Sequence, residues 1–226
     1  MASLESPSSA EELYRYRGSD VPLTRPIFQG DIFAGVHIPG IEDGAGLAMV
    51  ITHACSMRQG HSLRARLIVA RVELRTPPIP LPWSGNFRFM PLPDLTPGEP
   101  GSWATNFEAL GTIRSEILLM AERIACLDDR GVLLLQQRHA HHLTRYVVET
   151  EALYEQCASV LGEAELLEEW LTASLEDLED GCSGRVAEEA AEFDAFVGPF
   201  RDDLNDPSRR ASVRRTVNQE IRRRFR

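Results

Sequence analysis

Hydrophobic residues in the first part of the chain occur in short runs that have the length of β-strands. We expect one strand within 26–38 and a second, almost fully apolar strand at 47–52. The glycine-rich stretch 39–46 between them favours a turn. A third apolar run covers 67–74. The pattern therefore predicts a hairpin followed by a third, buried strand.

A proline-rich segment at 76–101 comes next and holds eight of the 14 prolines. It encloses one predicted strand, 86–92. Proline has no N–H to donate to a neighbouring strand, so we expect this strand at an edge of the sheet. Residues 107–119 are predicted to supply the last one or two strands.

The hydrophobic period then changes from that of strands to that of helices. Asp128 and Asp129 can cap a helix, and acidic residues suit its positive end. Residues with a 3.6-residue spacing predict its apolar stripe: Val132, Leu135, His139, Leu143 and Tyr146. Within this helix, His139 and His142 share the stripe. They suit hydrogen-bonded core residues or, as an alternative, two metal ligands.

The last third of the chain has the pattern of a helical hairpin over 150–204, with a turn at 181–184. Gly162 could interrupt its first helix, and Gly198-Pro199 should break or kink the second. A final helix is predicted over 206–226, with Asp206 as its cap and Pro207 at its first position. Its apolar residues form one narrow stripe among arginines.

We therefore predict an α+β protein in which an SH3-like β-barrel is followed by an α-helical hairpin and a basic C-terminal helix. Residues 1–19 would form an N-terminal arm, 20–148 the barrel with its closing helix, and 149–226 a helical lobe. In that lobe the acidic hairpin spans 150–204 and the basic helix 206–226.

Three segments resemble the MazF/PemK toxin family of small RNA-binding or RNA-cleaving barrels. They are 26–57, with Phe28-Gln29-Gly30-Asp31-Ile32-Phe33, then 107–113, and 123–127 with the helix that follows. The likeness covers roughly 26–146. It implies an SH3-like barrel of MazF/PemK type and a bacterial toxin–antitoxin, stress or phage-defence context.

The same resemblance indicates which residues would cut RNA. The family's arginine, in an Arg-Pro pair before the second strand, aligns with Gly46-Leu47, and its Ser/Thr on the third strand aligns with Val72 or Glu73. Glycine and valine can neither stabilise a charged phosphorane nor shuttle a proton. Thr52 matches a Ser/Thr at the end of the second strand. A metal-independent endoribonuclease of this type is therefore the alternative to a non-catalytic protein.

A second alternative is a metal- or thiol-dependent enzyme built on His53-Ala54-Cys55 and His61. If His53 and Cys55 lie on a strand, they point to the same face, and zinc could use them with His61. His53 could also activate Cys55 as a nucleophile. The third interpretation is a packed strand end with incidental polar residues. We predict no bound cofactor, and free thiols at Cys55, Cys126, Cys157 and Cys182.

Charge is distributed unevenly over the predicted helices. All 24 basic residues are arginine. Residues 1–148 carry 14 arginines and 15 acids, 149–204 carry 2 and 17, and 205–226 carry 8 and 2. The basic end can pair with the acidic helices, within the chain or across a dimer, or can contact nucleic acid.

Two sets of candidate binding residues follow. In the proline-rich region, Phe87, Arg88 and Phe89 could form a stacking platform for single-stranded bases. In the basic helix the candidates are Arg209, Arg210, Arg214, Arg215, Arg222, Arg223 and Arg224.

The sequence shows no long apolar run and no leader peptide, so we expect a cytoplasmic protein that does not enter membranes. The preferred interpretation is a non-catalytic interaction protein. Its partner would be a protein, a second copy bound through the helical lobe, or RNA or DNA.

Overall fold

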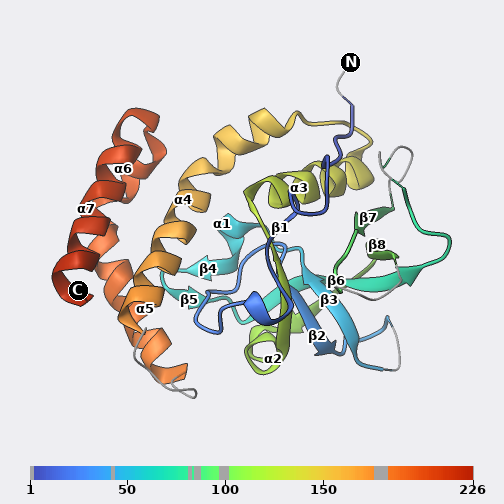
Figure 1. Ribbon diagram of the computed structural model, residues 1–226, viewed down its shortest axis with the longest axis horizontal. Helices are drawn as coiled ribbons and strands as arrows, with labels where there is room; N and C mark the ends of the chain where they lie inside the picture. The colour runs from blue at the N-terminus through green and yellow to red at the C-terminus, as the bar shows by residue number, and fades with distance from the viewer. Residues whose placement is uncertain are drawn as a thin grey trace. The chain divides into compact units, whose positions relative to one another are not determined.

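The computed structural model describes residues 3–41, 44–80, 83, 88–96, 102–175 and 183–225. Its fold is α+β, with a seven-stranded antiparallel sheet curled into a half-barrel and a group of helices (Figure 1). The chain divides into two compact units. The first consists of Met1–Val21, Phe28–His53 and Arg64–Glu155, and the second of Pro22–Ile27, Ala54–Leu63 and Gln156–Arg226.

The sheet lies in the first unit and has the strand order β1-β9-β2-β3-β6-β8-β7. Its strands are β1 (Tyr14–Arg17), β2 (Ile32–Val36), β3 (Gly46–Val50), β6 (Arg66–Arg75), β7 (Phe89–Leu92), β8 (Ser102–Arg114) and β9 (Glu122–Leu127). The predicted hairpin is confirmed, since Ile32 pairs with Met49. The third strand and the edge position of β7 are confirmed as well.

Two parts of the sheet differ from the sequence prediction. The expected strand at 107–119 ends at Arg114, and a helix, α2 (Ser115–Met120), takes its place. The predicted N-terminal arm contains β1, whose Tyr14 pairs with Leu127 of β9. The alternation of tyrosine and arginine over β1 has the two-residue period of a strand, which the sequence interpretation missed.

Helix α3 (Asp129–Thr144) follows β9, and Asp128 caps it as predicted: its Oδ1 accepts a hydrogen bond from the Gly131 N–H at 2.6 Å. The predicted apolar stripe holds only in the first half of the helix. Leu143 is 64% exposed and Tyr146, beyond the helix end, is 78% exposed. Residues 131–138 are instead buried on every side, because this half of α3 fills the core of the first unit.

The second unit contains the helices that follow and a small hairpin. Its elements are α1 (Ala54–Met57), β4 (Arg58–Gln59), β5 (Ser62–Leu63), most of α4 (Thr150–Ser174), α5 (Ser183–Val197), the 3₁₀ turn η2 (Gly198–Phe200), α6 (Arg201–Asn205) and α7 (Pro207–Phe225). The predicted break at Gly198-Pro199 is confirmed by η2. Gly162 does not interrupt α4. The predicted turn at Gly181 and Cys182 lies outside the described residues.

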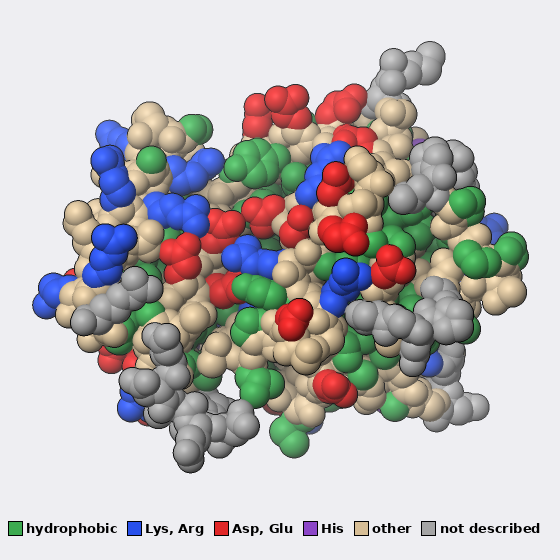
Figure 2. Space-filling view, in the orientation of Figure 1, with side chains coloured by type: hydrophobic (Ala, Val, Ile, Leu, Met, Phe, Trp, Pro, Cys, Tyr) green, Lys and Arg blue, Asp and Glu red, His purple; other side chains and the backbone are tan. Residues whose placement is uncertain are grey.

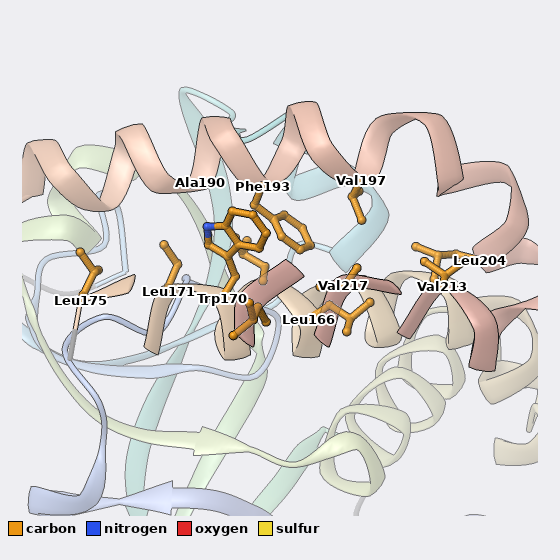
Figure 3. Packing of buried hydrophobic residues seen from close by; sticks show 12 residues of the cluster. Leu166, Trp170, Leu171, Leu175, Ala190, Phe193, Val197, Leu204, Val213 and Val217 are labelled. Atoms are coloured by element: carbon orange, nitrogen blue, oxygen red, sulfur yellow. The ribbon is translucent and has the colours of Figure 1, made fainter. Parts of the chain in front are cut away.

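One apolar core holds these helices together (Figure 3). Trp170 of α4 is fully buried, and its ring centroid lies 5.8 Å from that of Phe193 in α5. In Figure 3, α4 from Leu166 to Leu171 runs opposite to α5 from Ala190 to Val197, as a hairpin requires. Helix α7 adds Val213, Val217 and Ile221, so its apolar stripe is covered within its own unit.

The start of α7 agrees with the sequence in detail. Pro207 is its first residue, and the Asp206 carboxylate accepts a hydrogen bond from the Ser208 N–H at 2.9 Å. Across the described ranges, none of the helices combines the length and the apolar character that a membrane span needs.

Candidate functional site

The hydroxyl of Thr52, a candidate for RNA cleavage, is part of the sheet. Its Oγ1 accepts a hydrogen bond from the Ile68 N–H at 2.6 Å, and the Thr52 N–H donates to the Ile68 carbonyl at 3.1 Å. The side chain therefore continues the ladder between the end of β3 and β6. A group held in this way contributes to the fold rather than to proton transfer.

The positions that align with the toxin family's cleaving groups carry structural contacts. A Cβ atom at Gly46 would lie 2.0–2.2 Å from the guanidinium atoms of Arg71. Val72 is buried, and Glu73 accepts a hydrogen bond from Asn106 at 3.3 Å. The absence of a side chain at position 46 therefore makes room for Arg71 of the neighbouring strand.

The histidine and cysteine candidates do not share one element. His53 ends a segment of the first unit, whereas Cys55 lies in α1 and His61 between β4 and β5 of the second. The expectation that His53 and Cys55 share one face of a strand is wrong, because the strand ends at Val50 and Cys55 is helical. The His61 Nδ1 lies 3.9 Å from the Asp194 carboxylate.

The acid–base properties of these two side chains do not favour an activated thiol. Burial lowers the pKa of His53 and raises the pKa of Cys55. A thiolate–imidazolium pair needs the two opposite shifts. In the part of the chain that the structure describes, no three His, Cys, Asp or Glu side chains are grouped so as to hold a metal ion.

Other predicted features of the first unit have partners inside the protein. Arg88 pairs with Glu108 at 3.3 Å, and the Arg75 guanidinium lies 4.1 Å from the centroid of the Phe89 ring. Phe87 lies outside the described residues. In the proposed stacking platform, the ring of Phe89 is thus already covered by Arg75.

His139 is half-buried, but its Nε2 has no hydrogen-bond partner among the described residues, so the predicted hydrogen bonding is not found at that atom. The described cysteines are free thiols, as predicted. The imidazole of His139 packs on Phe107, with ring centroids 5.3 Å apart, and burial lowers the pKa of His139. Cys55, Cys126 and Cys157 are free thiols, and Cys182 lies outside the described residues.

The arginines of α7 divide into two groups. Those on its flanks are paired with carboxylates of the same unit, as one of the two sequence interpretations predicted. The pairs and their N–O distances are Arg209 with Asp203 (2.8 Å), Arg214 with Glu165 (3.0 Å) and Glu169 (2.8 Å), Arg223 with Glu220 (2.6 Å), and Arg224 with Glu192 (2.7 Å) and Glu220 (2.6 Å). Hydrogen bonds from Arg223 and Arg224 lower the pKa of Glu220 to about 2.

The second group forms no ion pair with a carboxylate among the residues that the structure describes: Arg210, Arg215 and Arg222. Arg210 still interacts electrostatically with the Asp206 carboxylate. Arg210 donates to the Leu204 carbonyl at 2.8 Å and Arg215 to the Ala211 carbonyl at 3.3 Å, and both bonds are to the backbone. Arg215 and Arg222 are exposed and lie two turns apart on one side of α7. Within the described ranges, neither arginine forms an ion pair with an acidic residue of α4 or α5.

The outward side of α7 is a groove of about 700 Å³ that combines these arginines with uncharged polar residues. It is lined by Ala211, Arg214, Arg215, Asn218, Gln219 and Arg222. No acidic side chain is among them. In Figure 2 the Lys and Arg side chains gather over α6 and α7. We call the residues that line this groove the α7 outer face.

Comparison with known proteins does not assign this surface. A scan against models of protein families finds no match, and no curated protein matches the sequence significantly.

Proposed function

We propose that this protein is a non-catalytic interaction protein that binds nucleic acid through the α7 outer face. The observation that carries the proposal is the pair of exposed arginines, Arg215 and Arg222, on a face without acidic residues. Arg, Asn and Gln side chains contact phosphate groups in nucleic-acid complexes, and all three types line this face.

A protein partner or a second copy of the chain fits this helix less well. The large apolar residues of α7, Val213, Val217 and Ile221, are buried against α4 and α5. Protein interfaces depend on apolar and aromatic residues at their centre. The α7 outer face offers only Ala211 as an apolar group.

The first unit has no catalytic role in this proposed function. The hydroxyl of Thr52 holds the sheet together, and Gly46 and Val72 carry no group that acts on a phosphate. The half-barrel, with its β2–β3 hairpin and α3 after the last strand, supports a diverged barrel of MazF/PemK type. A role in toxin–antitoxin, stress or phage-defence systems follows from the resemblance alone and stays a prediction.

Substitution of two side chains tests the proposal better than deletion of the helix. Removal of α7 would expose the core around Trp170, because three residues of α7 are part of that core. We suggest the double variant R215Q/R222Q, in which both positions are exposed. Its affinity for labelled DNA and RNA of mixed sequence is measured by fluorescence anisotropy. Two lost phosphate contacts should weaken binding at least about tenfold.

A matched control is available in the sheet. Arg66 and Arg114 are exposed and lie opposite each other on β6 and β8, so R66Q/R114Q removes the same charge. This control should bind as the unchanged protein does. If the full-length protein binds neither DNA nor RNA, or if both double variants lose affinity equally, the proposal is wrong.

A further inference from the structure

Four side chains of the α7 outer face have the chemistry that reads base pairs. Arg215, Asn218, Gln219 and Arg222 follow the spacing i, i+3, i+4 and i+7, which places them on one side of a helix. In the major groove of DNA, arginine forms paired hydrogen bonds with guanine, and asparagine or glutamine with adenine. Asparagine and glutamine also contact phosphates, but here their amides lie between two arginines on one side of the helix, where all four side chains can reach base edges.

The dimensions of α7 suit this use. It is regular from Pro207 to Phe225, about 28 Å long at 1.5 Å per residue. From Arg215 to Arg222 the rise is about 10 Å, which corresponds to about three base pairs of duplex DNA. The major groove is about 12 Å wide and admits an α-helix.

The surroundings of the four residues leave that face free to approach a duplex. Ala211 precedes them along the same side, and its small side chain does not obstruct the approach of a duplex. The flanking Arg209 and Arg223 are 65% and 71% exposed. Exposed ion pairs contribute at most about 1 kcal/mol, so these arginines can exchange their carboxylate partners for phosphates at the groove edges.

We propose that α7 is a recognition helix that enters the major groove of double-stranded DNA and reads about three base pairs through Arg215, Asn218, Gln219 and Arg222. This inference rests on the proposed nucleic-acid binding and specifies its ligand. The major groove of an RNA duplex is too deep and narrow for side chains to read, so the proposal selects DNA over RNA.

The first experiment compares ligands. The full-length protein is used to select tight binders from a pool of randomised DNA duplexes. Anisotropy then measures its affinity for the selected duplex, the RNA duplex of the same sequence, each single strand and a polyglutamate chain. We expect the selected DNA duplex to bind at least about tenfold more tightly than the RNA duplex.

The second experiment tests the groove and the side chains. Replacing guanine by 7-deazaguanine removes the N7 acceptor in the major groove and should weaken binding about tenfold. R215K keeps the charge but loses the paired hydrogen bonds, and N218A and Q219A lose the amides. These variants should weaken binding to the selected duplex about tenfold and leave binding to unrelated duplexes unchanged, whereas R66Q changes neither. Thermal unfolding by circular dichroism checks that each variant is folded.

The outcomes separate the two proposals. If DNA and RNA duplexes bind equally and 7-deazaguanine has no effect, the recognition helix is wrong, but nucleic-acid binding stands. If only polyglutamate binds, or no ligand does, both proposals are wrong. The recognition helix is also contradicted if R215K, N218A and Q219A all select the same DNA sequence as the unchanged protein.

Discussion

At the scale of single residues, one carboxylate connects three segments of the first unit. Glu5, near the N-terminus, accepts a hydrogen bond from the Thr150 hydroxyl at 2.7 Å at the start of α4. It also pairs with Arg130, and its N–H donates to Gln137 at 2.8 Å. Its carbonyl accepts from Arg138, a buried arginine whose pKa is lowered by desolvation to about 10. Glu5 therefore fastens the N-terminal segment to α3.

Replacement of this carboxylate should be costly at neutral pH. We expect E5Q to lower the free energy of unfolding by about 1–2 kcal/mol, because an amide loses the charge-assisted bonds to Arg130 and Thr150. Urea denaturation measures the change, and E151Q, at an exposed position in the first turn of α4, is the matched control with a change below about 0.5 kcal/mol.

The difference in unfolding free energy between wild type and E5Q should depend on pH. Burial by itself raises the pKa of Glu5, but hydrogen bonds from Thr150 and Arg130 outweigh it, and the pKa falls below its ordinary 4.5. The carboxylate is thus ionised more readily in the folded state. Its contribution is complete above pH 4.5 and is lost as the pH falls through the lowered pKa. A difference between wild type and E5Q that stays constant through this range would contradict the assignment.

At the scale of elements, two glycines inside helices have opposite surroundings. A Cβ atom at Gly131 in α3 would lie 2.4 Å from the Leu13 carbonyl oxygen, which accepts a hydrogen bond from the Asp128 N–H. At Gly162 in α4, a Cβ atom would have no contact within 4 Å. Gly131 therefore lets the N-terminal segment approach α3 closely, whereas Gly162 has no packing role.

The two glycine-to-alanine substitutions should change stability in opposite directions. G131A should destabilise the protein by about 1–3 kcal/mol, because the backbone at Leu13 must move. G162A should stabilise it by about 0.5–1 kcal/mol, because alanine favours the helix. Urea denaturation of both variants provides the measurement, and each serves as the control for the other. Equal changes in the two variants would contradict the close contact at Gly131.

At the scale of the whole molecule, charge is separated along the chain. The net charge is -10, although residues 205–226 carry eight arginines and two acids. Acidic residues of α4 and α5 neutralise part of this excess through Arg214 and Arg224. Two arginines that form no ion pair with the described carboxylates, Arg215 and Arg222, lie on the α7 outer face, so binding of nucleic acid there should be a local event that depends strongly on salt.

The salt dependence can be assigned to individual arginines. For duplex DNA, each phosphate contact contributes about 0.9 to the slope of log K against log salt concentration. On duplex DNA of mixed sequence, where Arg215 and Arg222 contact phosphates rather than a recognised base sequence, we expect R215Q/R222Q to reduce that slope by about 2, and R66Q/R114Q to leave it unchanged. Anisotropy titrations over a series of sodium chloride concentrations measure it. An unchanged slope in R215Q/R222Q would show that these arginines do not contact phosphates.

Local interactions explain what the sequence by itself determined. The β2–β3 hairpin follows from two apolar runs with a glycine-rich stretch between them. Asp128, Pro199 and Asp206 mark helix boundaries, because caps and breaks involve residues only a few positions apart. The stripe of α7 could be predicted from its period. The arginine-rich helix could likewise be proposed as a binding element from composition alone.

Contacts between distant residues were decided only in the tertiary structure. Arg214 meets Glu165 and Glu169, some 45 to 49 positions earlier in the chain, whereas Arg215 beside it meets no carboxylate among the described residues. The sequence pattern treats these neighbours as equivalent. The helix at Cys55 was not evident from the neighbouring residues, whereas the tyrosine–arginine alternation of β1 was a local signal that the prediction missed. Packing thus selects which arginines are neutralised within the fold and which remain available to a ligand.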